Sequence, residues 1–226
     1  MQNLKIHIEV NPALYSKNPD STELGRKIVS NSIGLIHELG FDAFTFKKLS
    51  IKIGSPESSI YRYFESKHHL LAYLTSWYWS WIEYKVVFAT VNVSSARTKL
   101  KEVIKLLTEP IKEDQTFSHI NEVLLDEIVR SESVKTFHVK NVDSCDQKGF
   151  YDSYKNVVQR ICLILNELNP KYSYPHMLIS TVIEGAHQQK LFAEHIPSLS
   201  DVNNKVNNIS DFYTNLVLNT ILNEQK

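Results

Sequence analysis

A short run of polar, aromatic and cationic side chains lies around residue 60 and comprises Glu57, Ser58, Ser59, Tyr61 and Arg62. Such carboxylate, hydroxyl and guanidinium groups can hydrogen-bond to base edges in the major groove of DNA. If the stretch is helical, Ile60 and Phe64 lie four residues apart on the opposite face and would pack inward. The residue types therefore predict nucleic-acid readout, while the spacing alone fits an ordinary helical hairpin with a solvated face equally well.

Charge favours a local rather than a general interaction with phosphate. Residues 45–67 hold five basic and two acidic side chains, a net of +3, whereas the whole chain has 25 of each sign. Residues 1–70 contain nine basic and seven acidic residues, and residues 71–226 contain 16 and 18. Any electrostatic attraction to DNA is therefore expected to be confined to the N-terminal region.

The sequence offers no arrangement typical of catalysis. Of the nine histidines, His68 and His69 are adjacent and would point about 100° apart on a helix, which does not suit chelation. Cys145 and Cys162 have no metal-ligand spacing and are too few for a disulfide scaffold. Nucleophile elbows, phosphate loops and dinucleotide fingerprints are absent. We expect no catalytic residue, no metal and no cofactor. An enzyme built on a helical bundle remains an alternative, which clustered acidic or histidine side chains around a cavity would favour.

Residues 45–67 must be held as two short helices if the polar run is to be presented. Thr45 is a candidate N-cap, and Gly54 suits a left-handed C-cap. Ser55 is a candidate N-cap for the second helix, with Pro56 at its first position.

This region resembles the DNA-binding signature of TetR-type (TetR/AcrR) transcriptional regulators, in the run Gly54-Ser55-Pro56-Glu57-Ser58-Ser59-Ile60-Tyr61-Arg62-Tyr63-Phe64-Glu65-Ser66-Lys67 followed by Leu70-Leu71. The resemblance covers about Leu24 to Leu74, and Ile60 to Phe64 with Ser66-Lys67 is its most specific part. It departs from the family pattern at Ser50 and Ile53, where alanines are common, and at Tyr63, where histidine is common. The first two affect packing inside the motif, and the third could alter a phosphate contact.

The resemblance implies a role for each residue of the motif. The base-facing set is Glu57, Ser58, Ser59, Tyr61 and Arg62, and the set near the DNA backbone is Thr45, Lys47, Tyr63 and Lys67. Arg62 is the candidate for a bidentate contact to guanine. Lys67, near a helix N-terminus, is expected to meet a phosphate.

The rest of the chain reads as helical. Helices are expected at 24–39, 66–88, 96–108, 118–131, 147–169, 175–195 and 210–222, with a break at 91–95 and a loop at 139–148. Residues 1–22 form a leader in which Leu4, Ile6, Ile8 and Val10 alternate with polar residues. That pattern is typical of a short strand, whose pairing partner stays open.

An aromatic cluster marks the helix expected at 66–88. Trp77, Trp81 and Phe88 share one face, so we expect them to be mostly core, packed between two domains, or in part to wall a ligand cavity. The residues expected to line such a pocket are Trp81, Phe150 and Tyr154, because all three are aromatic residues on helices of the expected bundle.

Together these observations predict an all-α protein with a leader at 1–22, a helix-turn-helix DNA-binding domain at 23–68 and a ligand-sensing and dimerisation domain at 69–226. The expected partners are a palindromic DNA operator, a second copy of the chain paired through the helices at 175–195 and 210–222, and an unidentified small-molecule effector. The resemblance implies a repressor. No apolar run reaches the ~18 residues of a membrane span and no secretory leader is evident, so a cytoplasmic location is expected. The alternative is a helical ligand-binding or scaffold protein whose helix-turn-helix no longer binds DNA.

Overall fold

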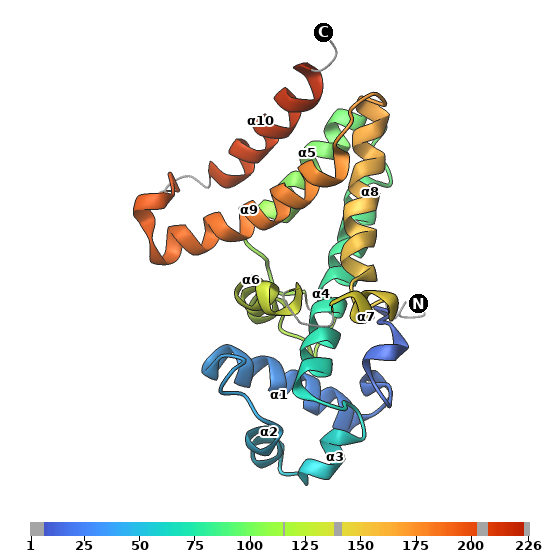
Figure 1. Cartoon of the computed structure of the whole chain (residues 1–226), viewed down its shortest axis with the longest axis vertical. Helices are drawn as coiled ribbons and strands as arrows, with labels where there is room; N and C mark the ends of the chain where they lie inside the picture. Colours follow the sequence, from blue (N-terminus) through green and yellow to red (C-terminus); the bar gives the residue numbers. More distant parts are fainter. Residues whose placement is uncertain (1–6, 115, 138–141, 203–207, 224–226) are drawn as a thin grey trace. The chain divides into compact units, whose positions relative to one another are not determined.

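The computed structural model describes residues 7–114, 116–137, 142–202 and 208–223, and it is all-α over those ranges (Figure 1). The helices are α1 (Glu23–Leu39), α2 (Phe46–Ile53), α3 (Glu57–Tyr61), α4 (Lys67–Thr90), α5 (Ala96–Thr108), α6 (Glu122–Phe137), α7 (Val142–Gln147), α8 (Asp152–Leu168), α9 (Pro175–His195) and α10 (Asn208–Asn223). Three short 3-10 helices accompany them: η1 (Pro12–Leu14), η2 (Pro19–Ser21) and η3 (Pro197–Leu199). Within the described ranges, no helix is both long and apolar enough to cross a membrane.

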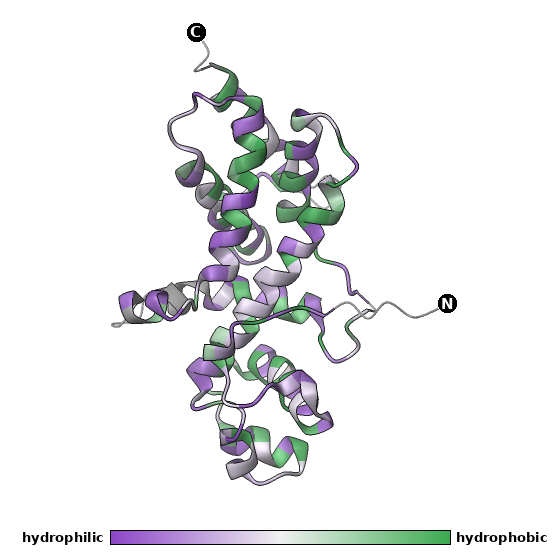
Figure 2. Cartoon of the chain, turned by 90° about the vertical axis from the view of Figure 1, so that its right-hand side faces the viewer, coloured by the Kyte–Doolittle hydropathy of each residue, from purple (hydrophilic) through white to green (hydrophobic). Residues whose placement is uncertain are grey.

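The chain forms two compact units. One combines the chain up to Trp81 with Ile111–Tyr154, and the other combines Ile82–Pro110 with the chain from Lys155 onward. In both, green apolar and purple polar residues alternate along the helices, as expected for helices with one buried face (Figure 2). The predicted boundary at residue 68 falls inside the first unit, so the functional division at 23–68 and 69–226 stays a prediction.

The middle of α4 is buried on every side within the first unit. Every residue from Tyr73 to Trp79 is buried. Two of its polar side chains there, those of Ser76 and Tyr78, find partners on other helices. The Tyr78 hydroxyl donates to Asp126 Oδ1 of α6 at 2.6 Å, and the Ser76 and Ser153 hydroxyls are 2.8 Å apart. Burial and the charge of Asp126 raise the pKa of Tyr78 well above its usual value, so the phenol stays protonated.

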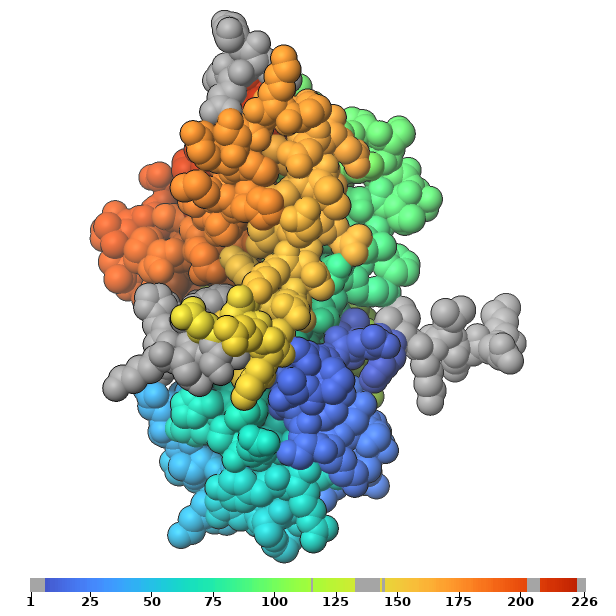
Figure 3. Space-filling model, turned by 45° about the vertical axis from the view of Figure 1, so that its right-hand side comes forward, coloured from blue at the N-terminus to red at the C-terminus, as the bar shows by residue number. Residues whose placement is uncertain are grey.

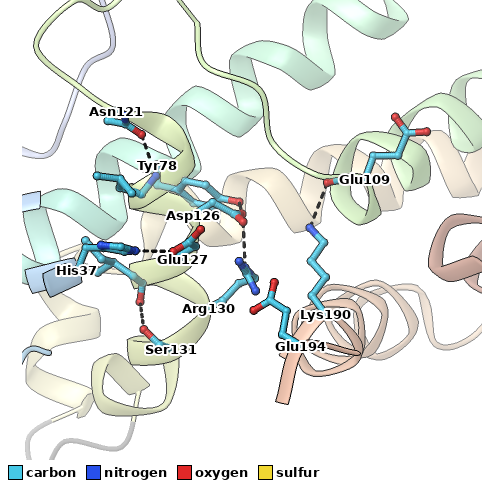
Figure 4. A network of polar contacts seen from close by, with 12 residues as sticks. His37, Tyr78, Glu109, Asn121, Asp126, Glu127, Arg130, Ser131, Lys190 and Glu194 are labelled. Atoms are coloured by element: carbon cyan, nitrogen blue, oxygen red, sulfur yellow. Dashed lines mark hydrogen bonds and ion pairs between the residues drawn. The ribbon is translucent and has the colours of Figure 1, made fainter. Parts of the chain in front are cut away.

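Asp126 is the centre of this polar contact, as Figure 4 shows. Its second oxygen accepts from Arg130 Nε at 2.9 Å, and both side chains are largely buried. A buried carboxylate is costly unless it is paired and hydrogen-bonded, and Asp126 meets both conditions. The same helix reaches α1, where His37 Nε2 and Glu127 Oε2 are 2.7 Å apart.

In the second unit, α10 packs against α5 and α9. Its buried stripe comprises Ile209, Tyr213, Val217 and Ile221. The Tyr213 ring lies over Gly185 of α9, where a Cβ would collide with the phenolic oxygen. Gly185 therefore leaves the space that this tyrosine ring occupies.

Most predicted helices are present, and the differences have local causes. The helix predicted from Ser118 begins at Glu122, because Asn121 Oδ1 accepts from Leu124 N at 2.9 Å and starts the helix there. The predicted loop at 139–148 is wrong for Val142–Gln147, which form α7; residues 138–141 lie outside the described ranges.

Two predictions about apolar patterns are also wrong. The alternation in the leader predicted a strand, but residues 7–22 form η1, η2 and extended chain; residues 1–6 are outside the described part. Ile8 and Val10 are nevertheless buried, so the alternation reflects one buried side rather than a strand ladder. Phe88, predicted to be core, is 64% exposed, because Ile82 and Val86 supply the buried face at that end of α4.

Gly25 in α1 generates a stability prediction. A Cβ at this position would lie 2.6 Å from Pro19 Cα in η2, so the helix can approach the leader only with glycine there. We expect Gly25→Ala to lower the free energy of unfolding by about 1–3 kcal/mol through overpacking. Chemical denaturation of the full chain measures the change.

Gly34, in the same helix, is the matched control. A Cβ there meets nothing within 4 Å. Gly34→Ala should therefore stabilise the protein by about 0.5–1 kcal/mol through helix propensity. Equal effects of the two substitutions would contradict a close contact between α1 and the leader.

Candidate nucleic-acid interface

The turn between α2 and α3 has the geometry that its sequence predicts. Thr45 Oγ1 accepts from Lys48 N at 3.2 Å and caps α2. Gly54 ends α2 in the left-handed region, with φ 66° and ψ 37°. The next amide, Ser55 N, donates to Ser50 O at 3.1 Å and closes the turn. These contacts fix the direction in which α3 leaves the turn.

The start of α3 differs from the prediction by one residue. Pro56 precedes the helix with ψ 144°, α3 begins at Glu57, and no side chain of the described residues caps it. The Ser55 amide is engaged with the end of α2, so Ser55 belongs to that turn rather than to the next helix. The result is a helix of only five residues, Glu57–Tyr61, with Arg62 still in the helical region at its end.

One side of α3 is buried and the other is open. Ile60 and Phe64 are both 0% exposed and hold the segment against the core of the first unit. The predicted base-facing residues are all partly or fully accessible: Glu57, Ser58, Ser59, Tyr61 and Arg62. Tyr61 is 50% exposed, and its ring edge rests on Phe46 of α2 with the ring centroids 5.0 Å apart. This contact orients the phenol without covering it.

Arg62 lies at the C-terminal end of α3. Its side chain is exposed and makes no hydrogen bond or ion pair with any residue in the ranges that the structure describes. A guanidinium with its donors unused keeps them available for an acceptor outside the protein.

The four residues predicted near the DNA backbone have different surroundings. Thr45 and Lys47 are exposed on the first turn of α2. Tyr63, by contrast, is 3% exposed, and its hydroxyl lies 2.8 Å from Thr22 Oγ1 at the start of α1. Its main-chain oxygen accepts from Ser16 N of the leader at 2.8 Å. Tyr63 thus ties α3 to the leader, which the sequence did not indicate.

Lys67 is engaged inside the domain. Its ammonium donates to the main-chain oxygens of Phe41, Asp42 and Phe44 at 2.9, 3.1 and 3.2 Å, and it lies over the Phe41 ring at 4.7 Å. Three acceptors match the three donors of a lysine ammonium. In this state Lys67 fastens the loop before α2 to the start of α4, and a phosphate would have to compete with those carbonyl groups.

Ile51 was not predicted as a site residue. It lies on α2, and its side chain is 75% exposed. An apolar side chain this exposed beside α3 can contact a thymine methyl or a deoxyribose. Its place in an amphipathic helix is the only sequence signal that marks it.

The residues predicted to line a ligand pocket contact three different aromatic partners. The fully buried Trp81 stacks on Trp77 with centroids 6.3 Å apart and planes 17° apart. The Phe150 ring meets His69, and the Tyr154 ring meets Trp79 at 4.7 Å. Within the described ranges, no three or more His, Cys, Asp or Glu side chains are grouped to hold a metal ion.

Comparisons with known proteins agree with this geometry. Residues 28–74 match the model of the family described as bacterial regulatory proteins, tetR family. No curated protein matches the sequence.

Several solved structures share the fold. A TetR family transcriptional regulator, PfmR from Thermus thermophilus, is 13% identical with a TM-score of 0.56, covering 85% of this chain and 97% of its own. The ketosteroid transcriptional regulator KstR2 of Mycobacterium tuberculosis is 14% identical with a TM-score of 0.55, covering 88% and 96%. A structure described as the superantigen PfiT is 13% identical with a TM-score of 0.56, covering 87% and 95%. At these identities the likeness extends to the fold alone. With the match at residues 28–74, it shows an N-terminal helix-turn-helix domain of the tetR family on a chain that has the fold of these regulators.

Proposed function

We propose that the protein is a homodimeric transcriptional repressor that binds a palindromic operator through α3 and is modulated by a small molecule held in its C-terminal helical region. The observation that carries the DNA-binding part is the difference in burial between the two sides of α3. Ile60 and Phe64 are wholly buried, while Tyr61 and Arg62 are left open. A helix held from behind with an accessible polar face is what major-groove readout requires.

In this proposal the five predicted residues of α3 read bases. Arg62 donates to the O6 and N7 of a guanine, and Tyr61 and the serines contact neighbouring edges. Glu57 repels phosphate and accepts from a cytosine amine, so it contributes selectivity rather than affinity. Thr45 and Lys47 contact the DNA backbone, where lysine adds affinity for any sequence.

Symmetric binding to a palindromic operator requires a dimer, and the exposed apolar side chains of α10 support the proposal of one. Ile209 and Tyr213 are buried within the unit, yet Phe212 and Leu216, four residues apart, are 57% and 38% exposed. Met177 of α9 is 68% exposed. Apolar side chains in this pattern on two neighbouring helices suit a four-helix contact with a second copy. Two α3 helices related by a dyad would then enter successive major grooves, about 34–36 Å apart.

The effector part of the proposal rests on the aromatic residues Trp81, Phe150 and Tyr154. Because Trp81 is fully buried and stacked, a ligand would reach it only by displacing protein side chains. Binding would then favour one arrangement of the helices around α4, and the affinity for DNA would change by the differential binding energy. For a repressor, we expect the bound ligand to lower the affinity for DNA and so to release the protein from its operator. Selection of bound DNA from a random pool at a stated salt concentration tests the whole proposal, and failure to enrich any sequence would favour the scaffold alternative.

The role of Arg62 gives a first prediction for DNA binding. Arg62→Ala should weaken binding to the selected operator by about 1–3 kcal/mol and relax preference at one base pair, because a bidentate contact is lost. Fluorescence anisotropy with single-base operator variants measures both effects. The exposed Arg97 of α5 offers a control, since Arg97→Ala should change neither. Unchanged affinity and preference in Arg62→Ala would count against the assignment.

A second prediction separates the two roles of Lys67. Because its ammonium serves three carbonyl oxygens, Lys67→Ala should lower the free energy of unfolding by about 1.5–3 kcal/mol. Lys47→Ala, at an exposed position of the same domain, should change it by no more than about 0.5 kcal/mol.

The salt dependence of operator binding decides whether either lysine also meets a phosphate. Loss of one phosphate contact reduces the slope of log affinity against log salt by about one. We expect that reduction for Lys47→Ala. A wild-type slope in Lys67→Ala would restrict Lys67 to its role inside the domain.

A third prediction concerns the dimer. Phe212→Glu should raise the dimer dissociation constant at least about tenfold, because it places a charge in an apolar contact. Phe88→Glu is a matched control, since Phe88 is 64% exposed but lies on α4. Sedimentation velocity over a concentration series measures both. Dissociation of the Phe88→Glu variant but not of the Phe212→Glu variant would place the interface elsewhere.

A further inference from the structure

A cavity of about 300 Å³ lies beneath the leader, in the first unit. Its walls come from leader residues between His7 and Asp20 and from Tyr73 of α4. Figure 3 shows this part of the leader, in blue, lying against the cyan and teal surface of the residues that follow α2. The cavity is separate from the polar face of α3 and from the predicted effector residues, so the proposed function leaves it unused.

The cavity has an acidic lining. Glu9 and Asp20 contribute carboxylates and His7 an imidazole, and no lysine or arginine is among the described residues that line it. Asp20 Oδ1 accepts from His119 Nε2 at 3.0 Å, which holds the carboxylate in place. The Arg26 guanidinium donates to the main-chain oxygen of Asp20 at 2.6 Å. The lining therefore favours a cation over an anion.

Two tyrosines complete the wall. The rings of Tyr15 and Tyr73 meet edge to face, with centroids 6.0 Å apart and planes at 78°. Tyr73 is 1% exposed, and its buried hydroxyl faces the carboxylate of Asp20. Burial and the nearby Asp20 charge raise the pKa of Tyr73, so the phenol keeps its proton.

Carboxylates beside aromatic rings form a site for a particular chemistry. Aromatic faces attract ammonium groups, above all alkylated ones whose hydration is weak, and carboxylates add charge attraction. A bare metal ion fits poorly, because in the described ranges no group of three or more ligating side chains is arranged around such an ion.

We propose that this cavity is a binding site for a small organic cation of the alkylammonium class, held by Asp20 and Glu9 and by the ring of Tyr15, which Tyr73 supports from behind. Its position gives such a ligand access to the DNA-binding elements, because the leader is bonded to the end of α3. Ser16 N donates to Tyr63 O, and the Tyr63 hydroxyl meets Thr22. A bound cation would hold the leader to α4 and so support the attachment of α3.

The test uses the full chain and a matched pair of probes in isothermal titration calorimetry. Choline carries a trimethylammonium group, and 3,3-dimethylbutan-1-ol is its uncharged isostere. We expect choline to bind at millimolar concentration or below and about tenfold or more tightly than the alcohol. Equal binding of the two probes, or no saturable binding of choline at millimolar concentration, would overturn the proposal.

Variants locate the site. Asp20→Asn and Glu9→Gln should each weaken choline binding about threefold or more, while Glu102→Gln on the exposed side of α5 should not. If Asp20→Asn disturbs the fold, the exposed Glu9 still carries the test, because its side chain supports no other contact in the described ranges. Wild-type affinity in a folded Glu9→Gln variant and in Asp20→Asn would show that choline binds elsewhere and would overturn the assignment.

Discussion

The structure depends on one helix that has no solvent-exposed side through its middle. From Tyr73 to Trp79 every side chain of α4 is buried, and two polar groups in that stretch are satisfied by other helices. Asp126 of α6 meets the Tyr78 hydroxyl, and Ser153 meets Ser76. These contacts set the register of α6 and of the first residues of α8 on α4. The start of α4 then fixes the loop before α2 through Lys67.

Attachment of α3 to the rest of the first unit is the second constraint. A helix of five residues buries little surface by itself and cannot hold its own position. Ile60 and Phe64 anchor it from behind, and Tyr63 anchors its end to the leader and to Thr22. Tyr63 stands where histidine is common in the family pattern, and in this chain it joins the leader to the motif. The leader is therefore hydrogen-bonded to the helix-turn-helix region, although no sequence motif in the leader indicates this contact.

The sequence predicted those features that are local. Caps and turn residues act within a few positions, so Thr45 and Gly54 could be placed from residue type alone. The helix ends predicted at Thr108 and His195 are also confirmed. Features that depend on partners distant in the sequence could not be predicted. The three carbonyl oxygens around Lys67 and the partner of the Tyr63 hydroxyl belong to segments many residues away. Periodicity shows which side chains share a face, but it does not show how far along a helix the core continues.

If α3 reads bases as proposed, its shortness limits how much DNA sequence the protein can recognise directly. Five residues rise only about 7.5 Å along a helix axis, which spans about two base-pair steps of B-DNA. Few nucleotides per half-site can then be distinguished by hydrogen bonds. Discrimination among genomic sites would have to draw on the stiffness and groove width of the flanking duplex as well. The deformability of an operator should then matter as much as its base sequence.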